Sequence, residues 1–426
     1  MPYPPSLYAT TAAPALAAPS LDGAATCDVC VIGGGFSGLS SALHLARKGY
    51  KVILLEADQV GYGASGRNGG QLGSAHVKLQ PDLVRRYGPD HARALWDLAE
   101  DAKALVKTLI AEEAIDCAYR PGNLGCAVTQ RDLKIFTDHA ALVARDYGYH
   151  AYQLFDRQKT AEVIGAPAYR GSLYDPTGGH LHPLNLALGI ARAAQRAGAE
   201  IYERSFVKQA IHGEKVLVKT SKGQVTADFL LYGCNGYLGH LAEEIAPRIL
   251  PADNYQIATE PLPADLAATV LTNGTAAWDT HKQVYYYRLS PDRRMIFGGG
   301  IGYPGQVPDN LADIVRAHMM KVFPQLADLR IDHAWAGTFC ATRSKLPDFG
   351  RLADNVFYVQ GYSGHGLALA NLGGQLMAEA LSTTAERFDV MATLKKQAFP
   401  GGRAFRRPVL ALGFLYLKLL DKLNVA

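Results

Sequence analysis

Residues 27–38 read CDVCVIGGGFSG, and residues 52–56 read VILLE. Together they predict a strand, a glycine-rich turn, a helix and a second strand that ends in an acidic residue. A dinucleotide-binding unit has this layout. Gly33 allows the tight turn, Gly35 lets the backbone approach a pyrophosphate, and Gly38 lets the helix pack closely on the strand. The alternative is an ordinary glycine-rich connection between a strand and a helix.

The helix after this turn, residues 39–48, is expected to receive the phosphates at its N-terminus. Unpaired N–H groups and the helix dipole favour negative charge there. Glu56 follows Gly33 at the spacing of a carboxylate that accepts hydrogen bonds from a ribose. The strand, the turn and the acid therefore predict dinucleotide binding.

Residues 61–71, GYGASGRNGGQ, follow almost at once and indicate which dinucleotide is bound. An NAD-dependent dehydrogenase would continue here with further strand–helix units. Small residues with one Arg, one Asn and one Gln instead favour a backbone that lies flat against a large planar ligand. The alternative is a flexible surface loop.

Length and charge set the broad class. The chain has 426 residues, enough for two domains with substantial cores. Its formal charge is +4 and its Lys and Arg residues are scattered, so no nucleic-acid partner is predicted. Cys27 and Cys30 form the one C-x-x-C pair and lie in a strand, which favours buried thiols in a reducing cytoplasm. The expected location is the cytoplasm, and no metal is predicted.

The two ends of the chain differ from the rest. Residues 1–26 are rich in Ala and Pro and carry no Lys or Arg, so they do not indicate a secretory signal. A disordered or surface-draped arm is expected there. No stretch approaches the roughly 20 apolar residues that a membrane span needs. The apolar tail 408–420 predicts a docked C-terminal helix, with weak contact to a membrane surface as the alternative.

The remaining elements follow from periodicity and turn residues. Helices are predicted over 82–114, 131–146, 184–197 and 367–381, and strands over 120–129, 284–288 and 295–297.

Three motifs then resemble a known family. They are VIGGGFSGLSSALHLARKGYKVILLEAD at 31–58 with GASGRNGGQ at 63–71, DPTGGHLHPLNLA at 175–187, and GYSGHGLALA at 361–370. By these motifs the chain is identified as a member of the FAD-dependent amine and amino-acid oxidases, which include D-amino-acid oxidase, glycine oxidase and monomeric sarcosine oxidase. Within the family it is most similar to the members that oxidise gamma-glutamylputrescine.

The resemblance implies an α/β fold, with a discontinuous Rossmann-like FAD-binding domain and a second domain built on an antiparallel sheet plus helices. The implied parts are 27–80, 170–245 and 335–385 for FAD, 81–169 and 246–334 for substrate, and 386–426 as a C-terminal segment. The FAD is expected to be non-covalent. Cys340 matches the attachment position of sarcosine oxidase only after a shift of one residue.

The resemblance also implies the reaction. The terminal primary amine of a gamma-glutamylated polyamine, gamma-glutamylputrescine, is expected to be oxidised to the aldehyde, with ammonia and H2O2 as the other products and O2 as the acceptor. Two alternatives stay open. One is an oxidase or dehydrogenase of glycine, sarcosine or a D-amino acid, and the other is a flavin-bound electron-passing subunit. Ala368 stands where sarcosine oxidase has a carboxylate-binding Lys, which favours a longer amine.

Three side chains are predicted to be catalytic: His365, Arg343 and Tyr287. His365 lies in the turn 361–366, whose N–H groups are expected to face the flavin; its ring adds positive charge or only braces the turn. In D-amino-acid oxidase an Arg at a similar place binds the substrate carboxylate. Arg343 is therefore predicted to do so here, with structural pairing as the alternative and Lys345 as the next candidate.

Tyr285 and Tyr287 are expected on one side of their strand and Tyr286 on the other, facing the substrate or packed within the sheet. The residues predicted to contact FAD are Gly33, Gly35, Phe36, Ser37, Gly38, Glu56, Ala57, Ala64, Ser65, Arg67, Asn68, Gly69, Gly70, Gln71, Val207, Asn235, Gly236, Gly361, Ser363, Gly364, His365 and Gly366.

Overall fold

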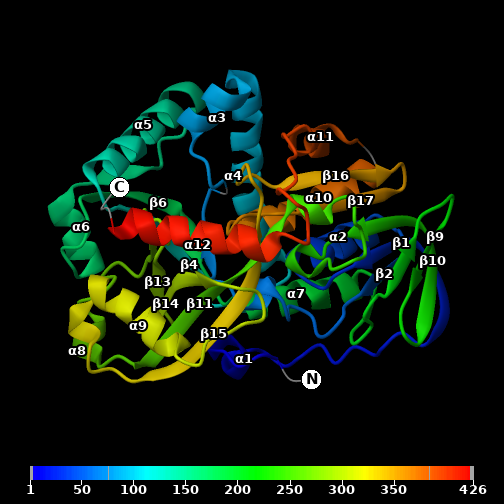
Figure 1. The fold of residues 1–426 in the computed structure, drawn as a ribbon, viewed down its shortest axis with the longest axis horizontal. Coiled ribbons are helices and arrows are strands. Elements are labelled where there is room, and N and C mark those ends of the chain that lie inside the picture. Colours follow the sequence, from blue (N-terminus) through cyan, green and yellow to red (C-terminus); the bar gives the residue numbers. More distant parts are fainter. Residues whose placement is uncertain (1–2, 75, 383, 423–426) are drawn as a thin grey trace.

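The computed structural model describes residues 3–74, 76–382 and 384–422, with side chains as far as residue 415. Two sheets lie side by side, one on the right of Figure 1 and the other at the lower left, and helices cover them (Figure 1). The long helix α4 (Pro89–Glu112) stands above them. This α/β fold with a second, mostly antiparallel sheet confirms the predicted fold class.

The first sheet contains the predicted dinucleotide strands. Its order is β16-β17-β10-β1-β2-β7, with the β8–β9 hairpin joined to β10. The strands from β17 to β7 are parallel, and β16 and β9 are antiparallel. The bounds are β1 (Gly23–Ile32), β2 (Val52–Leu55), β7 (Glu200–Tyr202), β8 (Gln209–Ile211), β9 (Val216–Lys219), β10 (Gly223–Tyr232), β16 (Asp348–Ala353) and β17 (Val356–Gln360).

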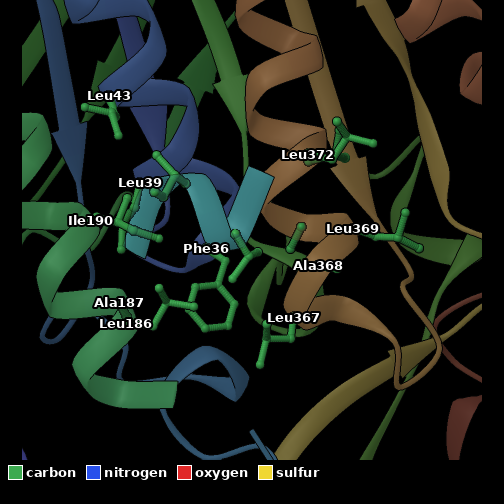
Figure 2. Packing of buried hydrophobic residues seen from close by; sticks show 14 of the residues in the cluster. Phe36, Leu39, Leu43, Leu186, Ala187, Ile190, Leu367, Ala368, Leu369 and Leu372 are labelled. Carbon is green, nitrogen blue, oxygen red and sulfur yellow. The ribbon is translucent and has the colours of Figure 1, made fainter. Parts of the chain in front are cut away.

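Three helices from distant parts of the chain cover one face of this sheet. They are α2 (Phe36–Arg47), α7 (Pro183–Arg196) and α10 (Gly366–Ser382). Phe36 at the start of α2 packs near Ala187 of α7 and Leu367 of α10, and all three are buried (Figure 2). A Cβ atom at Gly374 would overlap the carbonyl oxygen of Ser37, so this glycine lets α10 approach α2 closely. Apolar packing therefore sets the starts of α2 and α10 against each other.

The second sheet has the order β15-β11-β14-β13-β12-β4-β6-β3, with β5 beside β6. All its pairs are antiparallel except that of β12 with β4. The strand bounds are β3 (Gln71–Leu72), β4 (Arg120–Ala127), β5 (Gln153–Phe155), β6 (Gly171–His180), β11 (Leu250–Pro261), β12 (Ala276–Asp279), β13 (Tyr286–Leu289), β14 (Arg294–Gly302) and β15 (Ile331–Ala341). The helices around it include α5 (Gln130–Tyr147), α6 (Arg157–Ile164), α8 (Ala264–Ala267) and α9 (Leu311–Val322).

The single helix predicted over 82–114 is in fact two helices, α3 (Gln80–Tyr87) and α4. Gly88 separates them with φ of +81°, a left-handed conformation that glycine adopts readily. Pro89 then starts α4, where its missing N–H costs nothing.

Of the two alternatives expected for the N-terminal arm, disordered or surface-draped, the structure agrees with the draped one, because the arm is placed against the rest of the chain and most of its residues keep solvent exposure. Leu7 and Tyr8, in the short helix α1 (Leu7–Thr11), are 3% and 1% exposed. Side chains of the first domain hold the arm's main chain: Asn185 Oδ1 and Ser205 Oγ each accept an N–H at 2.8 Å. These buried side chains and hydrogen bonds hold the arm in place, which its Ala and Pro content did not predict.

The C-terminal tail forms α12 (Arg406–Lys422), after the short α11 (Glu386–Ala392). Leu410 is buried against Leu250 and Ala252 of β11, so α12 is docked by one side. Leu412 and Leu415 on its other side are 67% and 66% exposed. Across the described residues, no helix combines the length and the hydropathy that crossing a bilayer requires.

Buried histidines should make stability depend on pH. Burial lowers the pKa of His76 and His139 to about 4 and that of His180 to about 3, against about 6.5 in an unfolded chain. Between pH 6.5 and 4 the unfolded chain therefore binds more protons, and stability falls as pH falls. Glu56 has the opposite effect on stability: burial raises its pKa to about 7, so the folded chain binds this proton more tightly than the unfolded chain does.

We expect the free energy of unfolding to drop by several kcal/mol between pH 7 and pH 4.5, at roughly 1.4 kcal/mol per pKa unit for each histidine. Urea titrations at five pH values measure it. His139→Gln, which removes one of these protonations, should flatten the curve. Equal stability at pH 7 and pH 5 in the unaltered protein would contradict the prediction.

Candidate cofactor and substrate site

The glycine turn has the close approaches that a dinucleotide-binding turn needs. Gly33 has φ of +110°, and a Cβ atom there would lie 2.9 Å from the carbonyl oxygen of Gly233. A Cβ atom at Gly38 would overlap the carbonyl oxygen of Gly33. Helix α2 starts at Phe36 with Gly35 as its N-cap, slightly earlier than predicted. The turn therefore presents main chain to a ligand at a helix N-terminus.

Glu56 lies directly after β2, beside this turn. Its Oε2 accepts the N–H of Gly34 at 2.6 Å, and its Oε1 accepts that of Asp58 at 2.9 Å. Burial raises its pKa to about 7. The carboxyl group is therefore placed at the turn, where the ribose acceptor was predicted.

The loop 61–71 folds back onto the start of α2 instead of forming a flexible surface loop. Ser65 Oγ accepts the N–H of Phe36 at 3.0 Å. Asn68 closes the loop on itself: its Nδ2 donates to the carbonyl of Ala64 at 2.9 Å, and its Oδ1 accepts the N–H of Gly70 at 2.8 Å. This side chain explains the single Asn among small residues.

Arg67 joins this loop to the second sheet. Its Nη1 donates to the carbonyl of Ala336 in β15 at 3.0 Å, and its Nη2 donates to Tyr237 at 2.7 Å. Its own carbonyl accepts from Gln256 at 2.5 Å and from Trp335 at 3.2 Å. The Arg of the motif therefore holds the loop in place between the two sheets.

The late turn 361–366 meets the early segments. Asn235 Oδ1 accepts the N–H of Gly361 at 2.9 Å, and Ser37 in α2 shares a 2.6 Å hydrogen bond with Tyr362. No heavy atom lies within 4 Å of a Cβ atom built at Gly364, so open space adjoins this turn. The early glycine turn with α2, the loop 61–71, Asn235 and the late turn 361–366 therefore converge, although they come from three distant parts of the chain. Their glycine-lined main chain fits a dinucleotide.

His365 is neutral at pH 7. Its side chain keeps accessible surface, yet burial, and then the charge of Lys345, lower its pKa to about 4. Positive potential at this turn therefore comes from the N-terminus of α10 and from Lys345, not from His365. This favours the alternative to the predicted catalytic role, in which His365 only braces the turn.

The strand β13 corrects the prediction for Tyr287. Its ring stacks on Phe297 at 5.4 Å and its hydroxyl donates to Tyr169 at 3.0 Å, within the core of the second sheet. Tyr286 faces the other way: a Cβ atom at Gly69 would lie 2.7 Å from its ring, and its hydroxyl donates to Asn254. The alternation of side chains along the strand correctly placed Tyr286 and Tyr287 on opposite sides, but it could not tell which side faces the core.

Arg343 is not placed as expected for a residue that binds the substrate carboxylate. It is exposed, and its Nη1 donates to the carbonyl of Ala398 near the C-terminal tail at 3.2 Å. This is the structural pairing that was the alternative for it. Lys345, the next candidate, keeps accessible surface while burial, Lys78 and Lys282 lower its pKa. The charges acting on Lys345 are thus all positive.

Several other predicted contacts are placed as follows. Val207 is buried with Ile53 and Leu55 of β2, and Ala57 is exposed just after Glu56. Gly236 packs its Cα against Cys340, because a Cβ atom there would lie 3.4 Å from the sulfur. Gln71 Nε2 donates to the carbonyl of Ala277 at 2.7 Å. Sequence reasoning missed Asn254, Tyr8 and Arg288, since none belongs to a glycine motif, and it named Tyr286 without choosing it over Tyr285 and Tyr287.

Comparison with known proteins agrees with this geometry. The profile of a family described as FAD dependent oxidoreductase matches residues 28–380. The chain is 42% identical over 421 residues to gamma-glutamylputrescine oxidoreductase of Escherichia coli (strain K12), covering 99% of both. It is 37% identical over 400 residues to a probable oxidoreductase, OrdL, of Haemophilus influenzae, covering 93% of this chain and 92% of that one. The solved structure of glycine oxidase from Geobacillus kaustophilus shares the fold, with a TM-score of 0.71 at 20% identity, over 88% of this chain and 96% of that one.

Proposed function

The chain belongs to the family of FAD dependent oxidoreductases, and we propose that it oxidises the terminal primary amine of gamma-glutamylputrescine to the aldehyde, releasing ammonia and H2O2. The observation that carries this proposal is the full-length similarity to the Escherichia coli gamma-glutamylputrescine oxidoreductase at 42% identity. The glycine oxidase relative from Bacillus licheniformis is 24% identical, so a small amino acid is the weaker candidate.

FAD, when bound, accepts a hydride from the carbon that bears the amine and passes the electrons to O2. The chain binds it through the turn at Gly33–Gly38, the carboxyl group of Glu56, the loop at Ser65–Gly70 and the turn at Gly361–Gly366. We propose that the FAD is held non-covalently. Burial raises the pKa of the Cys340 thiol, which keeps it protonated and a poor nucleophile.

The amine must react as the neutral base, although its pKa in water is roughly 10. We propose that the substrate lies beside Tyr286, whose ring adjoins Gly69 of the cofactor loop. An aromatic wall removes water from the ammonium, which favours the neutral amine.

Lys345, whose pKa is lowered by burial and by Lys78 and Lys282, supplies what a gamma-glutamyl substrate needs at its other end, where it carries a carboxylate. Ala368 cannot bind a carboxylate: it is 3% exposed and packs in the apolar cluster around α2 and α10 (Figure 2). Lys345 keeps accessible surface and carries a positive charge next to the turn that contains His365. A substrate whose carboxylate is distant from its amine fits this arrangement.

The test uses the purified FAD-loaded protein and a coupled H2O2 assay. We expect turnover of gamma-glutamylputrescine and at least tenfold lower kcat/KM for glycine, sarcosine and D-alanine. Turnover of D-alanine without turnover of gamma-glutamylputrescine would overturn the proposal. A different result would show an electron-passing enzyme: the substrate reduces the flavin rapidly, O2 consumption is negligible, and a soluble quinone restores turnover. We also propose a cytoplasmic location, with which the six free cysteines agree.

A further inference from the structure

Arg288 is a buried cation behind the cofactor loop. It lies on β13 and is 4% exposed. Its Nε donates to the carbonyl of Gly69 at 2.9 Å, and its Nη2 donates to that of Leu181 at 3.0 Å. The N–H of Leu181 donates in turn to the carbonyl of Gly70 at 2.8 Å. Arg288 therefore holds the two glycines of the loop against the segment that starts α7.

The charge of Arg288 has no counter-ion in the described part of the chain: its hydrogen-bond acceptors are two carbonyls and one phenol. The nearby His180 and His182 do not add charge, because burial and Arg288 lower their pKa values to about 3 and about 4. A buried cation without a carboxylate is costly unless another anion lies near it. The location beside Gly69 points to the cofactor as that anion.

The phenol comes from the N-terminal arm. Tyr8 OH lies 3.2 Å from Arg288 Nη2. The Tyr8 ring is held edge-on by His182 at 5.0 Å and by Trp335 at 5.4 Å. Trp335 itself donates to the carbonyl of Arg67 in the cofactor loop at 3.2 Å. The arm thus reaches the segment that holds the cofactor loop, and Tyr8 completes the hydrogen bonding of Arg288.

We propose that Tyr8 and Arg288 are positioning residues for FAD. Together they hold the main chain of Gly69 and Gly70, and Arg288 places one positive charge behind this loop. The hydrogen bonds raise the affinity for FAD, and the charge favours the reduced flavin, which is anionic, over the oxidised one. The inference rests on FAD as the cofactor and not on the amine proposed above, so it stands or falls independently of the substrate assay.

The test measures flavin binding and potential without any amine. Tyr8→Phe keeps the ring and removes the hydroxyl, Arg288→Lys keeps the charge and removes the planar fork, and Arg288→Met removes the charge. Tyr3→Phe is the matched control, because Tyr3 also lies in the arm and its hydroxyl donates to the carbonyl of Val60 at 2.7 Å, away from Arg288. FAD dissociation constants come from titration of the apoprotein, and midpoint potentials come from equilibration with a redox dye.

We expect the FAD dissociation constant to rise about fivefold for Tyr8→Phe and about tenfold for Arg288→Lys, the size of one lost intramolecular hydrogen bond. For Arg288→Met, the ratio of affinities for reduced and oxidised FAD should fall about tenfold or more, whereas Arg288→Lys should keep it within about threefold. Tyr3→Phe should match the unaltered protein in both measurements.

Two results would overturn the proposal: Tyr8→Phe binding FAD as tightly as Tyr3→Phe, or Arg288→Met having the potential of the unaltered holoenzyme. If Arg288→Met does not fold, a midpoint potential for Arg288→Lys equal to that of the unaltered protein, together with weaker binding by Tyr8→Phe, supports the proposal. A lowered potential for Arg288→Lys, whose charge is retained, contradicts it.

Discussion

Replacing Gly38 with valine should abolish FAD binding, so that the purified protein is colourless. A Cβ atom at this position overlaps the carbonyl oxygen of Gly33, and its next neighbours are the carbonyl carbon of Gly33 and Val31 in β1. Backbone cannot move aside as a flexible side chain can. Helix α2 must therefore shift away from the strand, which displaces the N–H groups at its start from the phosphates.

The measurement is the FAD dissociation constant of the apoprotein, and we expect it to rise at least about 100-fold, in line with the cost of overpacking a close contact. Gly38→Ala, with one methyl group, gives a graded and better-folded test. Gly413→Val is the control, because no heavy atom lies within 4 Å of a Cβ atom there. Unchanged flavin content in Gly38→Val, at an unchanged melting temperature, would show that the turn does not bind the cofactor.

Replacing Lys345 with methionine should raise the KM for gamma-glutamylputrescine about 10- to 100-fold, with a smaller change in kcat. This is the expected loss of one charge-assisted hydrogen bond to a carboxylate. Methionine keeps the length of the side chain, so packing changes little. The segment that carries Lys345 is tied to the turn 361–366 through a side chain, since the N–H of Thr342 donates to Ser363 Oγ at 3.2 Å, and that contact stays.

N-Acetylputrescine separates a carboxylate contact from a general disturbance, because it has the same terminal amine and no carboxylate. Its kcat/KM should change by less than about threefold in Lys345→Met. Arg343→Met tests the sequence-based prediction directly: its exposed guanidinium should matter little for either substrate. Lys134→Met, at an exposed ion pair on α5, controls for the loss of charge. Equal losses for both substrates in Lys345→Met would refute the carboxylate contact.

The sequence by itself determined the cofactor unit. Gly33, Gly35, Gly38 and Glu56 lie within one strand–helix–strand unit, so their relation depends on local geometry and on where only glycine fits. The turn 361–366 was predicted for the same reason, whereas its hydrogen bond with Asn235 joins segments that are far apart in the sequence. A site built from main-chain groups can be predicted from the sequence, because the spacing of glycines shows where the main chain can approach a ligand.

Tertiary structure alone decided which side chains reach the site. Alternation places Tyr286 and Tyr287 on opposite sides of β13, but both are aromatic, so hydrophobicity cannot say which one is core. Arg343 instead donates to the carbonyl of Ala398, a contact with a distant segment that no local pattern indicates.

Tyr8 shows the same limit at the N-terminus. Its arm has the composition of a loose segment, and the reason for its order lies in Arg288, Trp335 and His182, which no local pattern connects to it. Glycine motifs encode the shape of the backbone over a few residues, whereas side-chain contacts between distant segments depend on how the two sheets pack. The cofactor was therefore predictable from the sequence, and the substrate side of the site was not.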